Sequence, residues 1–573
     1  MKRFLLNYVF ILLVTNASAQ DITIKAASNK LHDIHSLVEL DTISHSEDAE
    51  GNFYVNIKMQ NGAVYTFNVD DVTETYTESR DDVLRRGRYA DMVYAKSFKS
   101  VSELNKGDLI GVFSESDYST SEFVDAVYKN LANYGIGSIS SLFTGSVSAN
   151  VTLLALQKLV PSSSIRFHVV DIAYVGADID GSNIPLSARL IYPYGVGNRF
   201  SLSGVCIDNH VTVFERNQEP SSMFSPFSLA GLSSKGNLVI QPDLLGYGIS
   251  DNRSQMYVDR DINGSGVAYS LVAATQYAEI AADKEDGFTL SPDASVTNYG
   301  SSQGASTALH GTYFIENKLD KRVLKGLPKL TDTHVCAGAY DMKLAMDAFC
   351  SDDTLTYSCK LPMFLAGAVI AHSDAIRDPE GKPYKVTDFF NPALSDVVFT
   401  NVFGKTGNLW QLIDYKTQFE GIFARYFGSP VAPQRGSFAK IIARDMYKPG
   451  SDGRNVLDLD NPKVKALGPI LAMNDLTNPD MWIPQSDITM IHGDNDEIIP
   501  YACSTKLLSN MSQSMKQRGH TCTLKTLNDV PAINVNFGPH MISCFVWIIS
   551  ELTGISVDLV YPLLKSQIGS MQM

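Results

Sequence analysis

The chain has 573 residues, 44% of them hydrophobic and 19% charged, with 47 basic and 62 acidic side chains for a net charge of −15. This composition provides ample apolar material for a large folded core, and it excludes disordered, collagen-like and low-complexity classes. The acidic balance argues against nucleic acid as a partner.

The first residues predict export. Lys2 and Arg3 precede an apolar run over residues 4–14, followed by Ala17-Ser18-Ala19, which has the small-x-small form that signal peptidase accepts. The run is about half of the roughly 20 residues that a membrane-spanning helix needs. We therefore interpret residues 1–19 as a signal peptide cleaved near Ala19, and expect a secreted, periplasmic or cell-surface protein.

No later segment of the sequence predicts a transmembrane helix. The most apolar stretch, residues 541–564, is interrupted by Glu551 and Asp558. The seven cysteines show no Cys-x-x-Cys spacing, so a structural zinc site is not expected. Cys350 and Cys359 could bridge a short loop, and the odd total leaves at least one thiol free or pairing between chains.

Residues 20–92 predict a small β-rich N-terminal region. Apolar and polar residues alternate along 53–59 and again along 65–69, and Asn61-Gly62 between them is a hairpin signal of type I′. Residues 93–160 predict a helical segment that packs on the main domain, because apolar residues such as Phe123, Val127 and Leu131 recur at helical spacing.

From about residue 165 the pattern alternates between strands and helices. Strands are expected at 167–174, 186–192, 202–207, 237–241, 294–299, 488–491 and 522–527, and helices at 266–282, 305–314 and from 541. Such alternation predicts the α/β class, with a mostly parallel sheet covered by helices on both faces. We expect one α/β domain in two parts, 161–355 and 481–573, divided by a helical cap at 356–480.

The pentapeptide Gly300-Ser301-Ser302-Gln303-Gly304 has the Gly-x-Ser-x-Gly form. By itself it is weak evidence, but it stands between an expected strand and an expected helix, which is the setting of a nucleophile elbow. Small residues two before and two after the serine let the flanking segments approach closely. We therefore expect Ser302 to be a nucleophile at the carboxyl end of the sheet.

A serine hydroxyl needs a histidine to take its proton and a carboxylate to orient that histidine. His540 follows the expected strand 522–527 and so lies at the productive edge of the sheet, whereas His520 precedes that strand and lies at the opposite edge. The acid is expected after strand 488–491, where we favour Asp496 and keep Asp494 as the alternative.

These features resemble the α/β-hydrolase superfamily, and more narrowly its secretory lipases and esterases. The resemblance covers about 165–355 and 481–555 and rests on four patterns in order: Pro242 to Gly248, Gly300 to Gly304, His492-Gly493-Asp494-Asn495-Asp496, and Pro539-His540. It implies an α/β-hydrolase fold with a cap inserted where residues 356–480 lie. In that family the last position of His-Gly-x-x-Asp carries the acid, which favours Asp496.

An oxyanion hole of backbone N–H groups should hold the tetrahedral intermediate, and the residue after the nucleophile, Gln303, supplies the first. The second is expected from the loop after strand 202–207, with Thr212 and Val211 as candidates. Many relatives carry His-Gly in this loop, whereas this chain has His210-Val211. We interpret His210 as a residue that positions the loop.

The sequence thus predicts a secreted serine carboxylic-ester hydrolase acting through an acyl-enzyme, with no cofactor and no metal. Most aromatic residues in 356–480, such as Trp410, are expected to form the core of the cap. Those that face an acyl pocket favour a small-molecule ester with an apolar acyl or aromatic part. A prolyl-type serine peptidase uses the same triad, but the roughly 145 residues before the main domain are too few for the β-propeller that such relatives carry. The same residues are also compatible with a carbohydrate (acetyl or feruloyl) esterase and with a catalytically silent binding protein.

Overall fold

The computed structural model describes residues 21–26, 31–34, 40–47, 53–59, 64–68, 72–78, 92–95, 100–131, 165–195, 200–213, 219–225, 228, 236–250, 253, 255–257, 259–284, 287–351, 372, 375–389, 443–451, 455–533 and 538–571. The predicted signal peptide and much of the predicted cap lie outside these residues.

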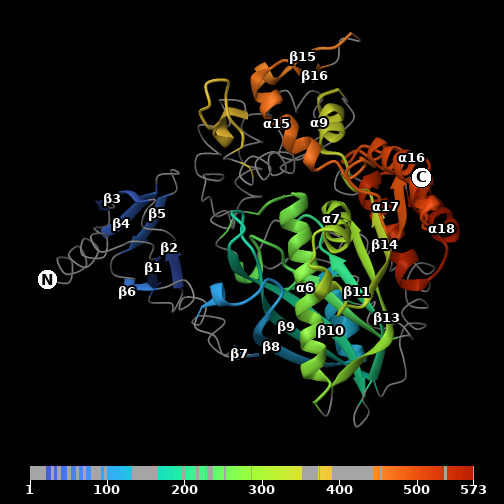
Figure 1. The fold of residues 1–573 in the computed structure, drawn as a ribbon, viewed down its shortest axis with the longest axis horizontal. Coiled ribbons are helices and arrows are strands. Elements are labelled where there is room, and N and C mark those ends of the chain that lie inside the picture. The colour runs from blue at the N-terminus through green and yellow to red at the C-terminus, as the bar shows by residue number, and fades with distance from the viewer. Residues whose placement is uncertain are drawn as a thin grey trace.

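A ten-stranded sheet forms the centre of the molecule (Figure 1). Its strands stand in the order β18 (Cys522–Leu527), β17 (Asp487–Gly493), β14 (Lys329–Cys336), β13 (Phe288–Ser301), β11 (Phe200–Asn209), β12 (Asn237–Pro242), β10 (Asn183–Gly195), β9 (Ile165–Ala177), β8 (Leu109–Ser119) and β7 (Val93–Tyr94). Neighbours from β18 to β12 are parallel, and the pairings from β12 through β10, β9 and β8 to β7 are antiparallel. Because parallel strands end at one edge, the carboxyl ends of β11, β13, β14 and β17 lie together.

Helices cover both faces of this sheet because its strands are apolar on both sides. Val170, Leu190 and Met490 belong to one buried cluster with residues of α6 (Arg260–Ala281), α7 (Gln303–Asn317) and α16 (Ala502–Gln517). The neighbouring residues along the same strands point the other way, toward α3 (Thr120–Leu131), α17 (Pro539–Thr553) and α18 (Val557–Met571). The sheet is therefore the middle layer of three, as the α/β class predicts.

The structure confirms the seven strands expected between residues 167 and 527, and it has helices at all three expected places. It also adds strand β14 and helix α16, which the sequence analysis did not predict. Residues 331–334 of β14 are all polar, and α16 carries several serines, so neither pattern is strongly apolar.

The prediction that residues 93–160 are helical is wrong for its first part. Residues 109–119 form strand β8, which pairs antiparallel with β9 and extends the sheet. Leu109 and Ile110 are buried in different clusters, so this segment uses the period of two that a strand requires. Helix α3 agrees with the expected spacing of Phe123 and Val127, and residues 132–160 lie outside the described part.

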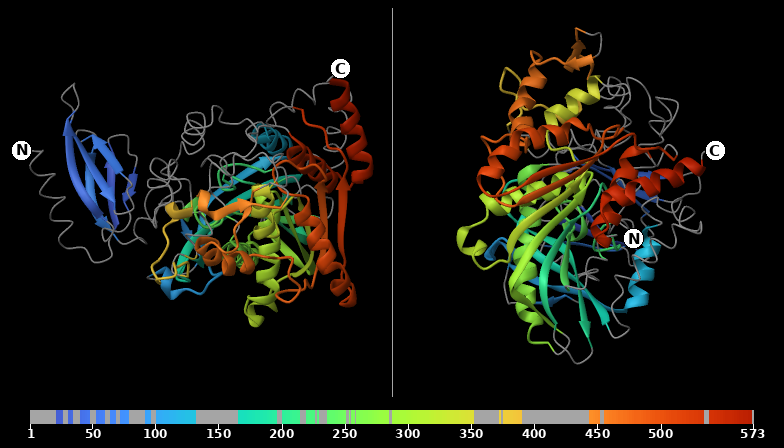
Figure 2. Two further views of the ribbon diagram at one scale, coloured as in Figure 1. Left: turned by 90° about the horizontal axis from the view of Figure 1, so that it is seen from above. Right: turned by 90° about the vertical axis from the view of Figure 1, so that its right-hand side faces the viewer.

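The described strands of the N-terminal region form two three-stranded sheets apart from the ten-stranded one, blue in Figure 2. One contains β2 (Leu31–Ile34), β1 (Asp21–Ala26) and β6 (Val72–Glu78), and the other β3 (Leu40–Glu47), β4 (Phe53–Met59) and β5 (Val64–Asn68). β4 and β5 pair antiparallel with Lys58 opposite Val64. This register differs by one residue from that of a two-residue turn at Asn61-Gly62, and the turn itself lies outside the described residues.

Between β14 and β17 the described segments include helices and a short two-stranded sheet, grouped together in Figure 1. They are α9 (Met342–Ser351), η8 (Val386–Phe389), η11 (Arg444–Met446), β15 (Tyr447–Pro449), β16 (Asn455–Leu457) and α15 (Pro462–Met473). The remaining short elements of the chain are η3 (Val101–Glu103), η7 (Gly248–Ser250) and α8 (Lys321–Leu324). None of the helices in the described ranges is long and apolar enough to cross a membrane.

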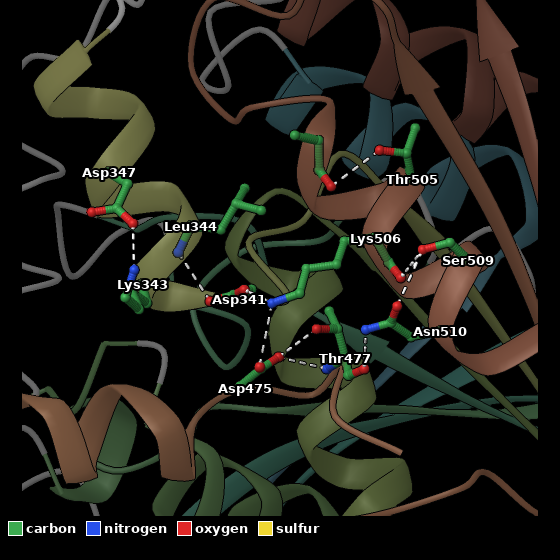
Figure 3. A network of polar contacts seen from close by, with 11 residues as sticks. Asp341, Lys343, Leu344, Asp347, Asp475, Thr477, Thr505, Lys506, Ser509 and Asn510 are labelled. Carbon is green, nitrogen blue, oxygen red and sulfur yellow. Dashed lines mark hydrogen bonds and ion pairs between the residues drawn. The ribbon is translucent and has the colours of Figure 1, made fainter. Parts of the chain in front are cut away.

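An ion pair joins the two ends of this inserted segment to α16 (Figure 3). The ammonium of Lys506 contacts the carboxylate of Asp341, at the start of the segment between β14 and β17. It also lies 3.5 Å from the carboxylate of Asp475, near the end of that segment. The other oxygen of Asp341 accepts the backbone N–H of Leu344 in the first turn of α9. Helix α16 thereby holds both ends of the insertion beside the loop that leaves β17.

Candidate active site

Ser302 stands at the sharp turn between β13 and α7. Its φ of 55° lies in the left-handed region that few residues other than glycine adopt, so its backbone is strained. A Cβ on Gly300 would lie 2.0 Å from the carbonyl oxygen of Gly304, and one on Gly304 would lie 2.2 Å from that of Asn209. Only glycine fits at both positions, and this is the close approach that the pentapeptide predicts.

The backbone of neighbouring strand β14 holds this turn in place. The N–H of Ser302 donates to the carbonyl oxygen of Cys336, the last residue of β14, at 2.9 Å. The side chains of Ser302 and Gln303 are both buried. The strained turn is therefore supported by the sheet edge, as strained residues at functional sites usually are.

Ser302, His540 and Asp496 form one hydrogen-bonded chain. The Oγ of Ser302 lies 3.0 Å from Nε2 of His540, and Nδ1 of the same ring lies 2.8 Å from Oδ2 of Asp496. An ionised carboxylate only accepts hydrogen bonds, so Nδ1–H donates to Asp496 and Nε2 is left to accept the serine proton. All three side chains are buried.

Three separate segments at the carboxyl edge of the sheet deliver these groups. Ser302 follows β13, Asp496 lies in the loop after β17, and His540 is the second residue of α17, after β18. The sequence predicted this helix from residue 541, after His540, whereas α17 begins at Pro539 and includes His540. A proline is suited to the first helical position because its missing N–H would have no partner there.

The carboxylate of Asp496 accepts four hydrogen bonds. Its Oδ1 accepts the backbone N–H groups of Ile498 and Ile499, both at 2.8 Å, and its Oδ2 accepts from His540 and, at 3.1 Å, from Nε2 of His492. Burial acts to raise the pKa of Asp496, but the two histidines outweigh it and hold that pKa well below its usual range. Asp496 is therefore a fixed negative charge.

His492 also supports this carboxylate, at the same oxygen that His540 contacts. Its Nε2 contacts both Asp496 Oδ2 and the carbonyl oxygen of Ile499, each at 3.1 Å, and both are acceptors. Nε2 therefore carries the proton, and Nδ1 accepts the hydroxyl of Ser504 at 2.7 Å. The sequence analysis quoted His492 only within the His-Gly-x-x-Asp pattern and did not predict this contact, since Ser504 comes from α16.

The alternative acid, Asp494, lies apart from this chain. It is exposed, and its Oδ1 accepts the backbone N–H of Asp529 at 2.9 Å. His520 lies at the opposite edge of the sheet, 3.4 Å from Asp487 at the start of β17, as the order of strands predicts. Neither residue contacts Ser302 or His540.

The expected oxyanion residues lie around the first turn of α7. Gln303 is the first residue of that helix, where backbone N–H groups are unpaired and the helix dipole favours negative charge. The loop with Val211 and Thr212 follows β11, and the contact of Gly304 with Asn209 places the start of that loop against α7. The hydroxyl of Thr212 contacts that of Tyr257 at 2.8 Å.

His210 has the surroundings of a loop-positioning residue. Its Nδ1 donates to the carbonyl oxygen of Val211 at 2.7 Å, and its ring packs edge-on against Tyr247, with centroids 4.9 Å apart. Burial lowers the pKa of His210 to about 4, so the ring is neutral near pH 7. His210 thus makes its hydrogen bond within its own loop and not with Ser302, His540 or Asp496.

The described residues contain no cluster of three or more His, Cys, Asp or Glu side chains suited to a metal ion. Five cysteines, Cys206, Cys336, Cys503, Cys522 and Cys544, are buried and carry free thiols. The site brings together a buried serine, an imidazole and a fixed carboxylate, the combination used in nucleophilic acyl transfer.

No protein-family model matches this sequence, and a search of curated proteins finds no match. Solved structures do match the fold. The rice cell wall degrading esterase LipA from Xanthomonas oryzae aligns with a TM-score of 0.51 at 17% identity, over 81% of this chain and 100% of that one. A single-substitution mutant of LipA aligns with a TM-score of 0.52 at 16% identity, over 78% of this chain and 98% of that one.

These similarities show that the chain has the α/β-hydrolase fold, which confirms the fold that the sequence resemblance implied. At 16–17% identity they show the fold and not the substrate. Function has to be argued from the site.

Proposed function

We propose that this protein is an exported serine hydrolase of carboxylic esters that acts through an acyl-enzyme. The observation that carries the proposal is the unbroken hydrogen-bonded chain from Ser302 Oγ through His540 to Asp496, at 3.0 and 2.8 Å. The setting of this chain at a strained strand–turn–helix junction supports the assignment, because such a turn is typical of the nucleophile of this fold.

In the first half of the reaction Ser302 Oγ attacks the ester carbonyl carbon while His540 Nε2 takes the hydroxyl proton. The tetrahedral intermediate then expels the alcohol, which receives that proton from His540. In the second half a water molecule attacks the acyl-enzyme, His540 takes its proton, and the carboxylic acid leaves as Ser302 is reprotonated. Asp496 stays ionised throughout and stabilises the imidazolium.

The negative oxygen of each tetrahedral intermediate needs N–H donors. We assign the first to the backbone of Gln303, at the positive end of α7, and the second to Thr212 or Val211 in the loop after β11. Donors that are fixed before the reaction stabilise the developing charge without reorganisation. This electrostatic stabilisation is usually the largest single contribution to lowering the barrier of acyl transfer.

For the substrate we propose a small neutral ester with an apolar acyl or aromatic part. The basis is the aromatic content of residues 356–480, which the sequence predicts to form a cap, together with the acidic net charge of −15, which does not attract anionic substrates. Export is proposed from residues 1–19 as a cleaved signal peptide. The LipA structures are described as those of a cell wall degrading esterase, so feruloyl and acetylated-sugar esters belong in the test.

The test is a substrate panel measured with the wild type and two serine variants. It contains nitrophenyl esters of graded acyl length, acetylated sugars, feruloyl esters and prolyl-aminoacyl amides. Ser302→Ala should lose at least about a thousandfold in kcat, since the nucleophile is absent. Ser301→Ala is the matched control, because it removes the same atom from the neighbouring residue and should keep kcat within severalfold.

Activity that survives Ser302→Ala contradicts the nucleophile assignment. Turnover of the amides faster than of every ester would replace the esterase with a prolyl-type peptidase. A well-folded wild type that turns over no member of the panel would favour the catalytically silent binding protein.

A further inference from the structure

The helix that carries His540 begins without a capping side chain of its own. Its N-cap residue is Gly538, which has no side chain, and Pro539 follows at the first helical position and has no N–H. The first N–H of α17 is therefore that of His540 itself. Helix N-termini usually satisfy such groups with the side chain of the N-cap residue.

Here the missing cap comes from Glu497, in the loop after β17. The N–H of His540 donates to Oε2 of Glu497 at 2.9 Å. A Cβ on Gly538 would lie 2.1 Å from the other oxygen, Oε1, so the whole carboxylate lies against the turn that starts the helix. Glycine is needed at this place because any side chain would displace that carboxylate.

Two consecutive acidic residues thus hold one histidine at two points. Asp496 accepts the ring N–H of His540 at 2.8 Å, and Glu497 accepts its backbone N–H. Asp496 is itself fixed by Ile498 and Ile499 of the same loop. The loop therefore sets both where the helix begins and how the imidazole is turned.

The negative charge of Glu497 also acts on the protonated form of His540. His540 stands at the second position of α17, where the positive end of the helix dipole disfavours an imidazolium. Acyl transfer needs that imidazolium in both halves of the reaction. A carboxylate at the same helix end offsets the dipole. Burial raises the pKa of Glu497, and the neighbouring His540 acts to lower it.

Resting on the function proposed above, we propose that Glu497 is a positioning residue for the reaction: its carboxylate caps α17 and stabilises the protonated form of His540. Among the residues that the structure describes, the other titratable groups that face His540 are Asp496, which also binds the ring, and the thiol of Cys544, one turn along α17. His492 contacts Asp496 and acts on His540 through it.

The test compares Glu497→Gln with Asp494→Asn, a matched control that also changes a carboxylate of this loop to an amide where it accepts one backbone N–H. Glutamine keeps an acceptor for the N–H of His540 and removes only the charge. The acid limb of the kcat/KM profile should move to lower pH by roughly half to one unit, and kcat should fall by about three- to tenfold. Asp494→Asn should move neither.

A second readout does not need activity. In the Ser302→Ala background, the ring titration of His540 followed by NMR should move its midpoint to lower pH when Glu497→Gln is added, and stay in place with Asp494→Asn. Glu497→Ala, which also removes the cap, should lower Tm by a few degrees.

An acid limb and a ring titration that are both unchanged in Glu497→Gln would overturn the inference. The same holds if Glu497→Ala lowers Tm while neither titration moves, because Glu497 would then be a structural cap alone. Full activity of Ser302→Ala would instead overturn the proposed function, so the two failures are distinguishable.

Discussion

Replacing Asp496 by asparagine tests the assignment of the acid most sharply. Oδ1 of Asp496 accepts two backbone N–H groups at 2.8 Å, and an amide oxygen can keep both bonds. The amide nitrogen must then occupy the place of Oδ2, facing the rings of His540 and His492. Since that nitrogen only donates, His540 has to accept at Nδ1 and carry its proton on Nε2. In that tautomer Nε2 cannot take the proton of Ser302.

The expected loss is about ten-thousandfold in kcat, the magnitude known for the equivalent change in chymotrypsin-type enzymes. At about 1.36 kcal/mol for each factor of ten, this corresponds to about 5.4 kcal/mol of transition-state stabilisation. Asp494→Asn should change kcat by no more than about twofold, because this exposed side chain accepts only the N–H of Asp529. The assay is the steady-state hydrolysis of the best nitrophenyl ester from the panel, with circular dichroism to confirm folding.

The same variant also tests a stability effect. In the folded chain the pKa of Asp496 is held below its usual range, and in the unfolded chain it returns to about 3.9. The carboxylate therefore contributes stability above about pH 4 that is lost as the pH falls below that value. Asp496→Asn should show a smaller loss of Tm between pH 5 and pH 3 than the wild type.

Equal and small losses of kcat in Asp494→Asn and Asp496→Asn would refute the assignment of the acid.

Three further substitutions test the supports of the site. Gly304→Ala should abolish activity and lower Tm, because its Cβ would lie 2.2 Å from a backbone oxygen; a soluble variant with wild-type kcat and Tm would contradict this packing. Ser504→Ala removes the donor to His492 Nδ1 and should lower kcat about two- to tenfold with little change in KM, whereas Ser504→Thr should restore it. Lys506→Met leaves buried Asp341 without its cation and should lower the free energy of unfolding by about 1–2 kcal/mol, a figure discounted because Lys506 is partly exposed. The measurement is urea unfolding, and an unchanged midpoint would show that this ion pair does not stabilise the fold.

Much of the site could be predicted because its elements are local. The strand–turn–helix setting of Ser302 and the strands before Asp496 and His540 can be recognised within short segments, and their order along the chain sets the edge to which each belongs. Spacing alone does not separate Asp496 from Asp494, and the family resemblance supports the preference for Asp496. In the structure the same choice follows from Asp496 being buried and Asp494 exposed.

The supporting residues could not be predicted in this way. His492 gains its function from Ser504 on α16, and Glu497 gains its own from His540 at the start of α17, 43 positions further along the chain. In a sequence, a histidine and a glutamate in an acidic turn are equally typical of a solvated surface loop. The backbone oxygen of Cys336 that holds Ser302 has no sequence signal at all, because every residue has a carbonyl group.

The sequence by itself determined the α/β class, the positions of most strands along the chain, and the residue types available for acyl transfer. These follow from the hydrophobic period and from turn chemistry, which act over a few residues. It misread residues 109–119, where a strand at the antiparallel side of the sheet was interpreted as helix. Only the tertiary structure decided how closely the segments at the carboxyl edge approach one another, and hence the distances in the hydrogen-bonded chain from Ser302 to Asp496. The physical reason is that these contacts join residues up to 238 positions apart, and only the packing of the sheet and its helices brings them together.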